Sequence, residues 1–199
     1  MFFLLIIIFS AIIHEYMHAW TADRLGDPTA KLMGRLTLNP LAHIELFGTI
    51  LMPFLLYVLS GGRFLIASAK PVPINPNALS NKKYGMAIVG AAGPLANFIV
   101  ALIFGLIIRV LPPSSFTAFL GIIVYANILL FIFNLIPVPP LDGSRILFAF
   151  LPPRFQYYSL VIERYGFIIS LIVAFLIFQL IQPIMFWIYH LLVGQSLLF

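Results

Sequence analysis

The run Ile12-Ile13-His14-Glu15-Tyr16-Met17-His18-Ala19 lies inside an N-terminal stretch, residues 2–22, that is otherwise mostly apolar. His14 and His18 are four residues apart, so on an α-helix both imidazoles leave the same face and can bind one metal ion. Glu15 lies beside them, where a carboxylate can accept a proton from a water molecule held by such an ion. Ionisable side chains in a membrane helix are costly and mark a functional site by default, so a histidine pair that merely caps or packs is the less favoured alternative.

The composition is typical of a membrane protein. Of the 199 residues, 62% are hydrophobic and 9% are charged, and the mean hydropathy is +1.10. A soluble core cannot absorb that much apolar surface, which predicts a single membrane-embedded domain over residues 1–199 in a lipid bilayer. Cysteine is absent, so disulfides and thiolate ligands are excluded and a metal would be bound by His, Asp or Glu. The net charge of +5 comes from basic residues between apolar runs, which reports topology and not a nucleic-acid partner.

The predicted fold is an all-α polytopic membrane protein with about four full transmembrane helices, at residues 2–22, 84–111, 116–136 and 165–192. Residues 46–60 are apolar but short, with Pro53 in the middle, so this segment either is re-entrant or spans with distortion. Over residues 31–39, Leu32, Gly34, Leu36 and Leu38 alternate with other residues. A period of two over that length predicts a small β-hairpin-like element after the first helix.

The basic residues favour one topology. If 46–60 is re-entrant, all of them but Arg109 face one side, which is then expected to be the cytoplasm. The same arrangement brings the C-terminal end of the 116–136 helix to the side that holds the two histidines. A full crossing of 46–60 would place Asp142 nearer the other face, and an extended crossing of 25–45 would restore the parity, so both alternatives remain open.

Asp142 is the best candidate for a third metal ligand. A catalytic zinc ion usually takes three protein ligands and leaves a fourth position for water. Asp142 follows a predicted span in a proline-rich stretch, where irregular backbone at membrane depth indicates a lined cavity, and Gly143 after it permits a tight backbone path. The alternative, Asp142 as the N-cap of a helix beginning near Ser144, is common for aspartate but leaves the histidine pair without a third ligand.

Three further polar groups lie in or next to apolar runs. Asn134 could donate to the oxyanion formed when water attacks a peptide carbonyl, or could hold two spans together by a hydrogen bond. Asn97 poses the same question, with packing favoured and substrate binding as the other option. His43 and Glu45 would share one side of an extended segment, as a substrate contact, an oxyanion contact, a partner of a ligating imidazole or, slightly favoured, a pair at the membrane interface. Leu36 lies on the predicted hairpin edge, which could bind an extended substrate by main-chain pairing.

Two motifs together resemble the site-2 protease family of intramembrane zinc metalloproteases, peptidase family M50. They are His14-Glu15-x-x-His18 in one predicted span and Asn134-x-x-Pro137-x-Pro139-x-Leu141-Asp142-Gly143 at the end of another. Gly93-Pro94-x-x-Asn97-Phe98 also looks like that family. Residues 34–40 (GRLTLNP) and 69–73 (AKPVP) look like its small prokaryotic branch, which lacks PDZ and CBS domains.

The resemblance implies one zinc ion held by His14, His18 and Asp142, with Glu15 as general base and Asn134 near the substrate or the oxyanion. It implies a multi-pass protein of a prokaryotic cell membrane that cleaves membrane-spanning segments of protein substrates near the cytoplasmic side. The rival hypothesis is a non-enzymatic divalent-metal transporter or metal-dependent membrane scaffold, because His and Asp at mid-depth also suit an ion pathway. A transporter is expected to show internal repeats, and the His-bearing segment has no second copy in the sequence. The physiological substrate and the oligomeric state do not follow from the sequence.

Overall fold

The structure, a computed structural model, describes residues 2–45, 49, 51–59, 61, 70–152 and 166–194, and every regular element in those ranges is helical. The helices are α1 (Phe2–Arg24), α2 (Thr29–Leu32), α3 (Pro40–His43), α4 (Met52–Leu59), α5 (Gly85–Val110), α6 (Ser115–Asn134), α7 (Asp142–Phe150) and α9 (Gly166–Val193). The predicted all-α class is therefore confirmed for the described part of the chain.

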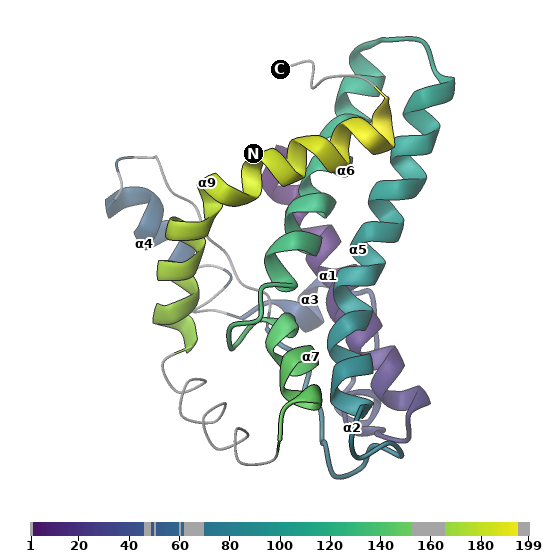
Figure 1. Cartoon of the computed structure of the whole chain (residues 1–199), viewed down its shortest axis with the longest axis vertical. Helices are drawn as coiled ribbons and strands as arrows, with labels where there is room; N and C mark the ends of the chain where they lie inside the picture. Colours follow the sequence, from purple (N-terminus) through teal and green to yellow (C-terminus); the bar gives the residue numbers. More distant parts are fainter. Residues whose placement is uncertain are drawn as a thin grey trace.

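Helices α1, α5 and α6 are long and apolar enough to cross a membrane, and they pack against one another. The protein is thus a multi-pass membrane protein, and the predicted spans at 2–22, 84–111 and 116–136 agree with these helices to within two residues. Helices α5 and α6 run in opposite directions, joined by a short turn at Pro112-Pro113, and α1 lies beside them (Figure 1). Ser114 begins α6 with a capping box, since its hydroxyl accepts from the Thr117 backbone N–H at 3.2 Å.

The main apolar core lies between α5, α6 and the C-terminal half of α9. Its buried members include Ala101, Val124, Ile128 and Met185, all fully buried or nearly so. Arg109, at the end of α5, donates from Nε to the Leu192 carbonyl oxygen at 2.9 Å. Positive side chains stabilise the carbonyl end of a helix, so this contact anchors the last turn of α9 to the bundle.

The fourth full span expected at 165–192 is supported only in part. Helix α9 covers nearly the same residues, but Figure 1 shows it bent, with its two halves running in different directions. Pro183 lies inside it, and a proline removes the hydrogen bond to the carbonyl four residues before, which bends the helix there. Within the described residues, the part from Gln179 to Val193 is an apolar helix shorter than a full crossing.

The β-hairpin predicted over 31–39 is wrong. The chain there leaves helix α2, makes a turn at Met33 and Gly34, and reaches α3 without forming a strand in this described stretch. Gly34 has a φ of +68°, a left-handed conformation that glycine adopts without strain, and the Arg35 backbone N–H bonds back to the Ala30 carbonyl oxygen at 2.8 Å. The alternation of leucines therefore comes from a compact turn, in which Leu36 packs against Ala19, Ala30 and Val72.

Part of the 46–60 segment lies outside the described residues. The part that is described contains α4, whose eight residues extend about 12 Å, far less than the roughly 30 Å of a hydrocarbon core. That helix by itself cannot cross a membrane, which agrees with the re-entrant alternative without deciding how 46–60 as a whole is placed.

The described basic residues separate toward the two ends of the bundle. Arg24 is the last residue of α1, and Lys82 and Lys83 precede the start of α5; these two ends lie side by side, because the Ser80 backbone N–H donates to the Leu25 carbonyl oxygen at 2.7 Å. Arg109 lies at the opposite end of α5. A re-entrant 46–60 gives this separation, and so does the alternative of an extended crossing of 25–45 with a full crossing of 46–60.

Candidate metal centre

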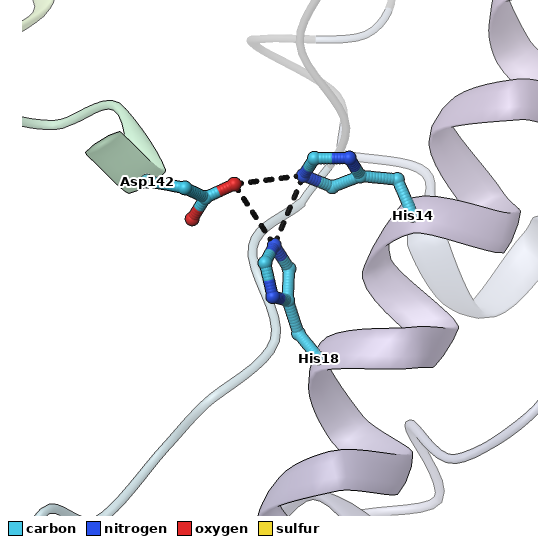
Figure 2. Close-up of side chains that lie close together, drawn as sticks. All are labelled: His14, His18 and Asp142. Carbon is cyan, nitrogen blue, oxygen red and sulfur yellow. Dashed lines mark hydrogen bonds and ion pairs between the residues drawn. The ribbon is translucent and has the colours of Figure 1, made fainter. Parts of the chain in front are cut away.

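The two histidines of α1 and the aspartate of α7 converge on one point. Nε2 of His14 lies 2.9 Å and Nε2 of His18 lies 3.0 Å from the same oxygen, Oδ2 of Asp142, and the two Nε2 atoms are 2.9 Å apart (Figure 2). All three residues are at least 94% buried, with exposed fractions of 6%, 3% and 6%. The imidazole planes stand nearly perpendicular, at 86°, so both rings present an edge to the carboxylate. Asp142 thus shares one buried site with two histidines that precede it by 128 and 124 positions.

The outer nitrogen of each ring determines which nitrogen carries the proton. Nδ1 of His18 lies 2.7 Å from the Val89 backbone carbonyl oxygen, which can only accept, so this Nδ1 carries hydrogen. Nδ1 of His14 lies 2.7 Å from Oδ1 of Asn97. The Asn97 oxygen is identified because its amide nitrogen donates to the Ser10 carbonyl oxygen at 3.1 Å. Each ring therefore donates through Nδ1, which leaves Nε2, the nitrogen facing Asp142, as the atom that can bind a metal when the ring is neutral.

This donor set fits a zinc ion. With both rings neutral, the two Nε2 lone pairs and the Asp142 oxygen, held within 3.0 Å of each other, would repel one another unless a cation lay among them. Ligand atoms around tetrahedral zinc, with bonds of about 2.0–2.1 Å, are about 3.4 Å apart, so the three atoms need to separate by only a few tenths of an ångström. The same three residues form the one metal-ligand cluster found among the described residues.

Asp142 is positioned by a tight return of the chain after α6. It is the first residue of α7, whose N-cap is Leu141, and the bonds of its carboxylate go to the side chains of His14, His18 and Arg145. The N-cap alternative is therefore not the role of this carboxylate. A Cβ on Gly143 would collide with the carbonyl group of Leu135, so the glycine lets the chain fold back closely on the end of α6. Arg145, one turn later, donates from Nη1 to Oδ1 of Asp142 at 3.0 Å and leaves Oδ2 for the histidines.

Helix α5 closes the other side of the site. An added Cβ on Gly93 would lie 2.5 Å from Nε2 of His18 and 2.6 Å from Nε2 of His14. Glycine is therefore required where the α5 backbone passes the two ligating atoms. Small residues in a membrane helix permit such a close approach of another element.

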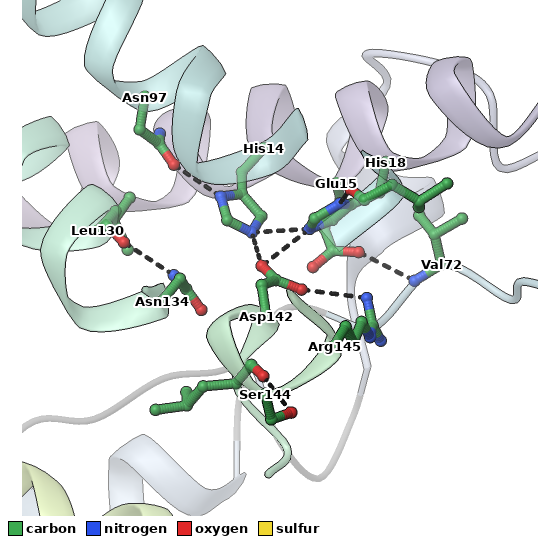
Figure 3. Close-up of polar contacts among 12 residues, drawn as sticks. His14, Glu15, His18, Val72, Asn97, Leu130, Asn134, Asp142, Ser144 and Arg145 are labelled. Carbon is green, nitrogen blue, oxygen red and sulfur yellow. Dashed lines mark hydrogen bonds and ion pairs between the residues drawn. The ribbon is translucent and has the colours of Figure 1, made fainter. Parts of the chain in front are cut away.

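Glu15 projects from the same helix as the histidines and is half-buried. Its Oε2 accepts a hydrogen bond from the Val72 backbone N–H at 2.9 Å (Figure 3). A cavity of about 100 Å³ opens beside it. The cavity is lined by His14, Glu15, His18, Pro71, Val72, Ile74, Asn134, Pro140, Asp142 and Arg145. A carboxylate that is not a ligand thus shares a small cavity with the three candidate ligands.

Asn134 and Asn97 are placed differently. Asn134 lines the cavity, and its amide nitrogen donates to the Leu130 carbonyl oxygen of its own helix at 3.0 Å. Asn97 is fully buried behind His14 and does not line the cavity. Its amide nitrogen also donates to Oδ1 of Asn127 at 2.9 Å, and Asn127 in turn donates to Oγ of Ser10 at 2.9 Å. Asn97 therefore orients a candidate ligand and links α1, α5 and α6.

His43 and Leu36 do not line the cavity. His43 is buried at the end of α3, and its Nε2 donates to the Thr37 carbonyl oxygen at 2.8 Å. Glu45 is exposed, and its backbone N–H bonds to Oγ1 of Thr49. Leu36 contacts Val72 from outside the cavity. His43 and Leu36 thus lie next to residues 70–72, of which Pro71 and Val72 line the cavity, while their substrate role stays a prediction.

The interpretation of the sequence missed four contributors to this site. Arg145 was recoverable, because a residue three positions after Asp142 on a helix shares its face. Asn127 and Ser10 also had a signal, since polar side chains in apolar spans need partners. No sequence signal pointed to the Val72 amide, because a backbone N–H group is present at almost every position.

The sequence profile of peptidase family M50 matches residues 2–113 and 111–180. The chain belongs to peptidase family M50. This M50 chain is 36% identical over 176 residues to YwhC of Bacillus subtilis, a match that covers 83% of this chain and 76% of YwhC. It is 32% identical over 169 residues to Rip2 of Mycolicibacterium smegmatis, covering 82% of this chain and 62% of that relative. The archaeal protein MJ0611 of Methanocaldococcus jannaschii is 28% identical over 140 residues, covering 68% of this chain and 63% of the relative.

The names of all three relatives describe them, provisionally, as zinc metalloproteases. No solved structure matches the M50 chain. The family match and the buried His-His-Asp cluster therefore agree on a zinc metalloprotease-like site in a protein with membrane-spanning helices.

Proposed function

We propose that this protein is an intramembrane zinc metalloprotease that hydrolyses peptide bonds in or near membrane-spanning segments of protein substrates. The observation that carries the proposal is the convergence of two imidazole Nε2 atoms and one carboxylate oxygen, with a further glutamate in the same cavity. The family membership and the provisional names of the relatives support the same activity.

His14, His18 and Asp142 would hold the zinc ion. A zinc ion bound there supplies Lewis acidity, which lowers the pKa of a water molecule and polarises the carbonyl group of the substrate. Glu15 accepts the proton from that water and later donates it to the leaving nitrogen of the cleaved peptide. The Val72 amide holds the Glu15 carboxylate toward the cavity while these proton transfers take place.

Asn134 is suited to contact the substrate. Its amide nitrogen donates one hydrogen to the Leu130 carbonyl oxygen and has a second hydrogen to donate. The side chain lines the same cavity as Glu15. A donor in this position would stabilise negative charge that develops on the carbonyl oxygen during attack. A helical substrate must unwind locally to reach it, because helical carbonyl groups are already hydrogen-bonded.

Hydrolysis is favoured over a transport or scaffold role by the position of Glu15. An ion pathway requires ligands, whereas Glu15 is not a member of the His-His-Asp cluster and has its carboxylate held by a backbone N–H. A carboxylate beside the ligands, held and half-exposed to the cavity, is the arrangement that a general base requires. Transport of zinc by the purified protein would favour the rival hypothesis.

We place the site toward the cytoplasmic side of a prokaryotic cell membrane. The basic residues that flank the site-bearing ends of α1 and α5 support this orientation, because such residues are enriched in cytoplasmic loops. Water and the substrate would reach the cavity from that side, through the polar loops.

Replacement of Glu15 by Gln tests the proposal. The purified protein in proteoliposomes is offered a tagged single-span protein whose apolar segment contains an Asn-Gly break, which favours unwinding. Wild type is expected to cleave it, and E15Q is expected to lose cleavage by at least about 100-fold while retaining zinc, since a general base contributes that much. Cleavage by E15Q at the wild-type rate would refute the assignment of Glu15.

A further inference from the structure

The short segment Lys70–Val72, of which Pro71 and Val72 line the cavity, is held by three hydrogen-bonding partners: His43, Arg35 and Glu15. We call residues 70–72 the strap. Its first backbone N–H, that of Lys70, donates to the His43 carbonyl oxygen at 3.0 Å, and its last, that of Val72, donates to Glu15. The side chain of Arg35 binds the carbonyl groups between them. The strap thus connects the turn after α2 and the end of α3 to the glutamate of α1.

Arg35 is a buried cation whose described side-chain bonds go to backbone oxygens. The residue is 8% exposed, and Nη2 donates to the Lys70 carbonyl oxygen at 3.1 Å and to the Pro71 carbonyl oxygen at 3.3 Å. Burial of a guanidinium group is costly, so its contacts must recover that cost. The planar group presents several donors in fixed geometry, which suits two successive carbonyl oxygens better than the single ammonium of lysine.

The strap has one amide available to hold Glu15. Pro71 and Pro73 lack a backbone N–H, so Val72 supplies the sole amide hydrogen between residues 71 and 73. The two oxygens that Arg35 holds belong to the residues directly before that amide. The orientation of the Val72 N–H toward Oε2 of Glu15 therefore depends on where Arg35 holds the peptide groups beside it.

We propose that Arg35 is a positioning residue for the general base: it holds the strap so that the Val72 amide keeps the Glu15 carboxylate in place. The inference rests on the proposed function of Glu15 as the base. It gives a physical role to Arg35 and to residues 70–72, which contribute no side chain to the metal cluster found among the described residues.

The experiment compares R35Q and R35K with wild type in three measurements. R35Q is expected to lower kcat on the tagged single-span protein by about 10- to 100-fold with little change in KM, because a misplaced base costs catalysis and not affinity. Hydrogen exchange at the strap is expected to accelerate by about three- to tenfold, because loss of the Arg35 contacts frees the Val72 amide. Among residues 70–73, Lys70 and Val72 alone carry an amide hydrogen, so the change can be assigned to them. R35K keeps the positive charge but not the planar guanidinium group with its several donors, so its kcat and its strap exchange are expected to lie between those of R35Q and wild type. All three proteins should bind zinc.

R24Q is the matched control. It removes the same charge from an exposed arginine at the end of α1 that stacks on Trp20, and it should leave kcat and strap exchange unchanged. A second route uses V72P, which deletes the amide hydrogen directly. If R35Q and V72P act on the same bond, the double variant should be little worse than the poorer single one. V72P and R35K carry the test should R35Q fail to fold.

The inference is overturned if R35Q keeps wild-type kcat, if its strap exchange is unchanged, or if R35Q and R35K both lose zinc. It is also overturned if the effects of R35Q and V72P on kcat multiply fully. None of these results touches the proposed function, which fails separately if wild type cleaves no substrate or if E15Q remains active.

Discussion

At His14 the two ring nitrogens have different neighbours. Nε2 faces a carboxylate oxygen and a second imidazole, while Nδ1 faces the amide oxygen of Asn97 at 2.7 Å. The hydrogen bond at Nδ1 determines which nitrogen is free to bind a metal and raises its basicity. The metal affinity of the site therefore depends on an amide that does not touch the metal.

Asn97→Leu tests this dependence. The change deletes the acceptor for the Nδ1 hydrogen of His14 without altering the side-chain size much, so zinc affinity is expected to fall about 10- to 100-fold. Competition with a chelator of known affinity gives the dissociation constant. Asn127→Leu removes a buried amide one step farther from the metal, at Nδ2 of Asn97, and should stay within about threefold of wild type. Equal losses in the two variants would show that both amides act through overall stability alone.

The chemistry of the residues was enough to predict the candidate metal ligands, but not the groups that hydrogen-bond to those ligands and to Glu15. His14, His18 and Asp142 could be proposed from the sequence because buried ionisable groups in an apolar chain are rare and must converge on something. Arg145, Asn127 and the Val72 amide were missed, and Asn97 was assigned to packing or substrate binding. Which polar group meets which depends on how the helices rotate against each other, and the apolar periodicity of a membrane span constrains that rotation weakly.

At the scale of the elements, the turn after α1 directs the chain from the helix that bears the two histidines back toward the site. Asp27 is fully buried there. Its carboxylate accepts from the Thr29 backbone N–H at 3.0 Å and the Asn75 backbone N–H at 2.7 Å. Burial alone would raise the pKa of Asp27, but the hydrogen bonds from Thr29 and Asn75 outweigh it and hold the pKa below its ordinary value of 3.8.

This pKa predicts how the turn responds to acid. Because the folded-state pKa lies below the unfolded value, the contribution of the carboxylate is fully present above pH 3.8 and is lost as the pH falls through the folded-state pKa. Asp27→Asn should therefore be less stable than wild type at pH 7, by about 1–3 kcal/mol. The difference should shrink below about pH 4, as measured by thermal unfolding in detergent at several pH values. A difference that stays constant down to pH 2.5 would contradict this assignment, and D23N, in an exposed pair with Lys31 at 3.5 Å, should change little at any pH.

The same region contains the clearest failure of the sequence pattern. Leucine alternation at 32–38 suggested a strand, yet Gly34 and the return bond from Arg35 to Ala30 form a turn between two short helices. Of the alternating leucines, Leu36 packs on the core whereas Leu32 and Leu38 are exposed, so the period of two does not mark the buried face of a strand here. The edge proposed for an extended substrate therefore does not exist at 32–38, and the segment contributes Arg35 to the strap instead.

At the scale of the whole molecule, the antiparallel arrangement of α1, α5 and α6 determines which loops share a side. The site-bearing ends of α1, α5 and α6 gather together, and the turn at Pro112-Pro113 lies at the other end (Figure 1). This arrangement was predictable, since span lengths and basic residues carry the information. The bend of α9 was not, because Pro183 leaves both its direction and its extent open.

Single cysteines test the orientation, and the natural absence of cysteine makes the background clean. Lys83→Cys and Pro113→Cys place exposed thiols at opposite ends of α5. In intact cells, a membrane-impermeant maleimide should label the cysteine at 113 and should label the one at 83 only after the membrane is opened. The reverse pattern would place the metal site toward the outside, and labelling of both in intact cells would contradict the spanning of α5.

The central claim is that two histidines and a distant aspartate share one zinc ion beside an unliganded glutamate. The most direct measurement is the zinc content of the purified protein together with its zinc K-edge absorption spectrum, for wild type, E15Q and D142A. Wild type and E15Q should each hold one zinc ion per chain, bound by two imidazoles and a carboxylate, and D142A should lose most of it. Wild type without zinc, or D142A with the content and spectrum of wild type, would contradict the account.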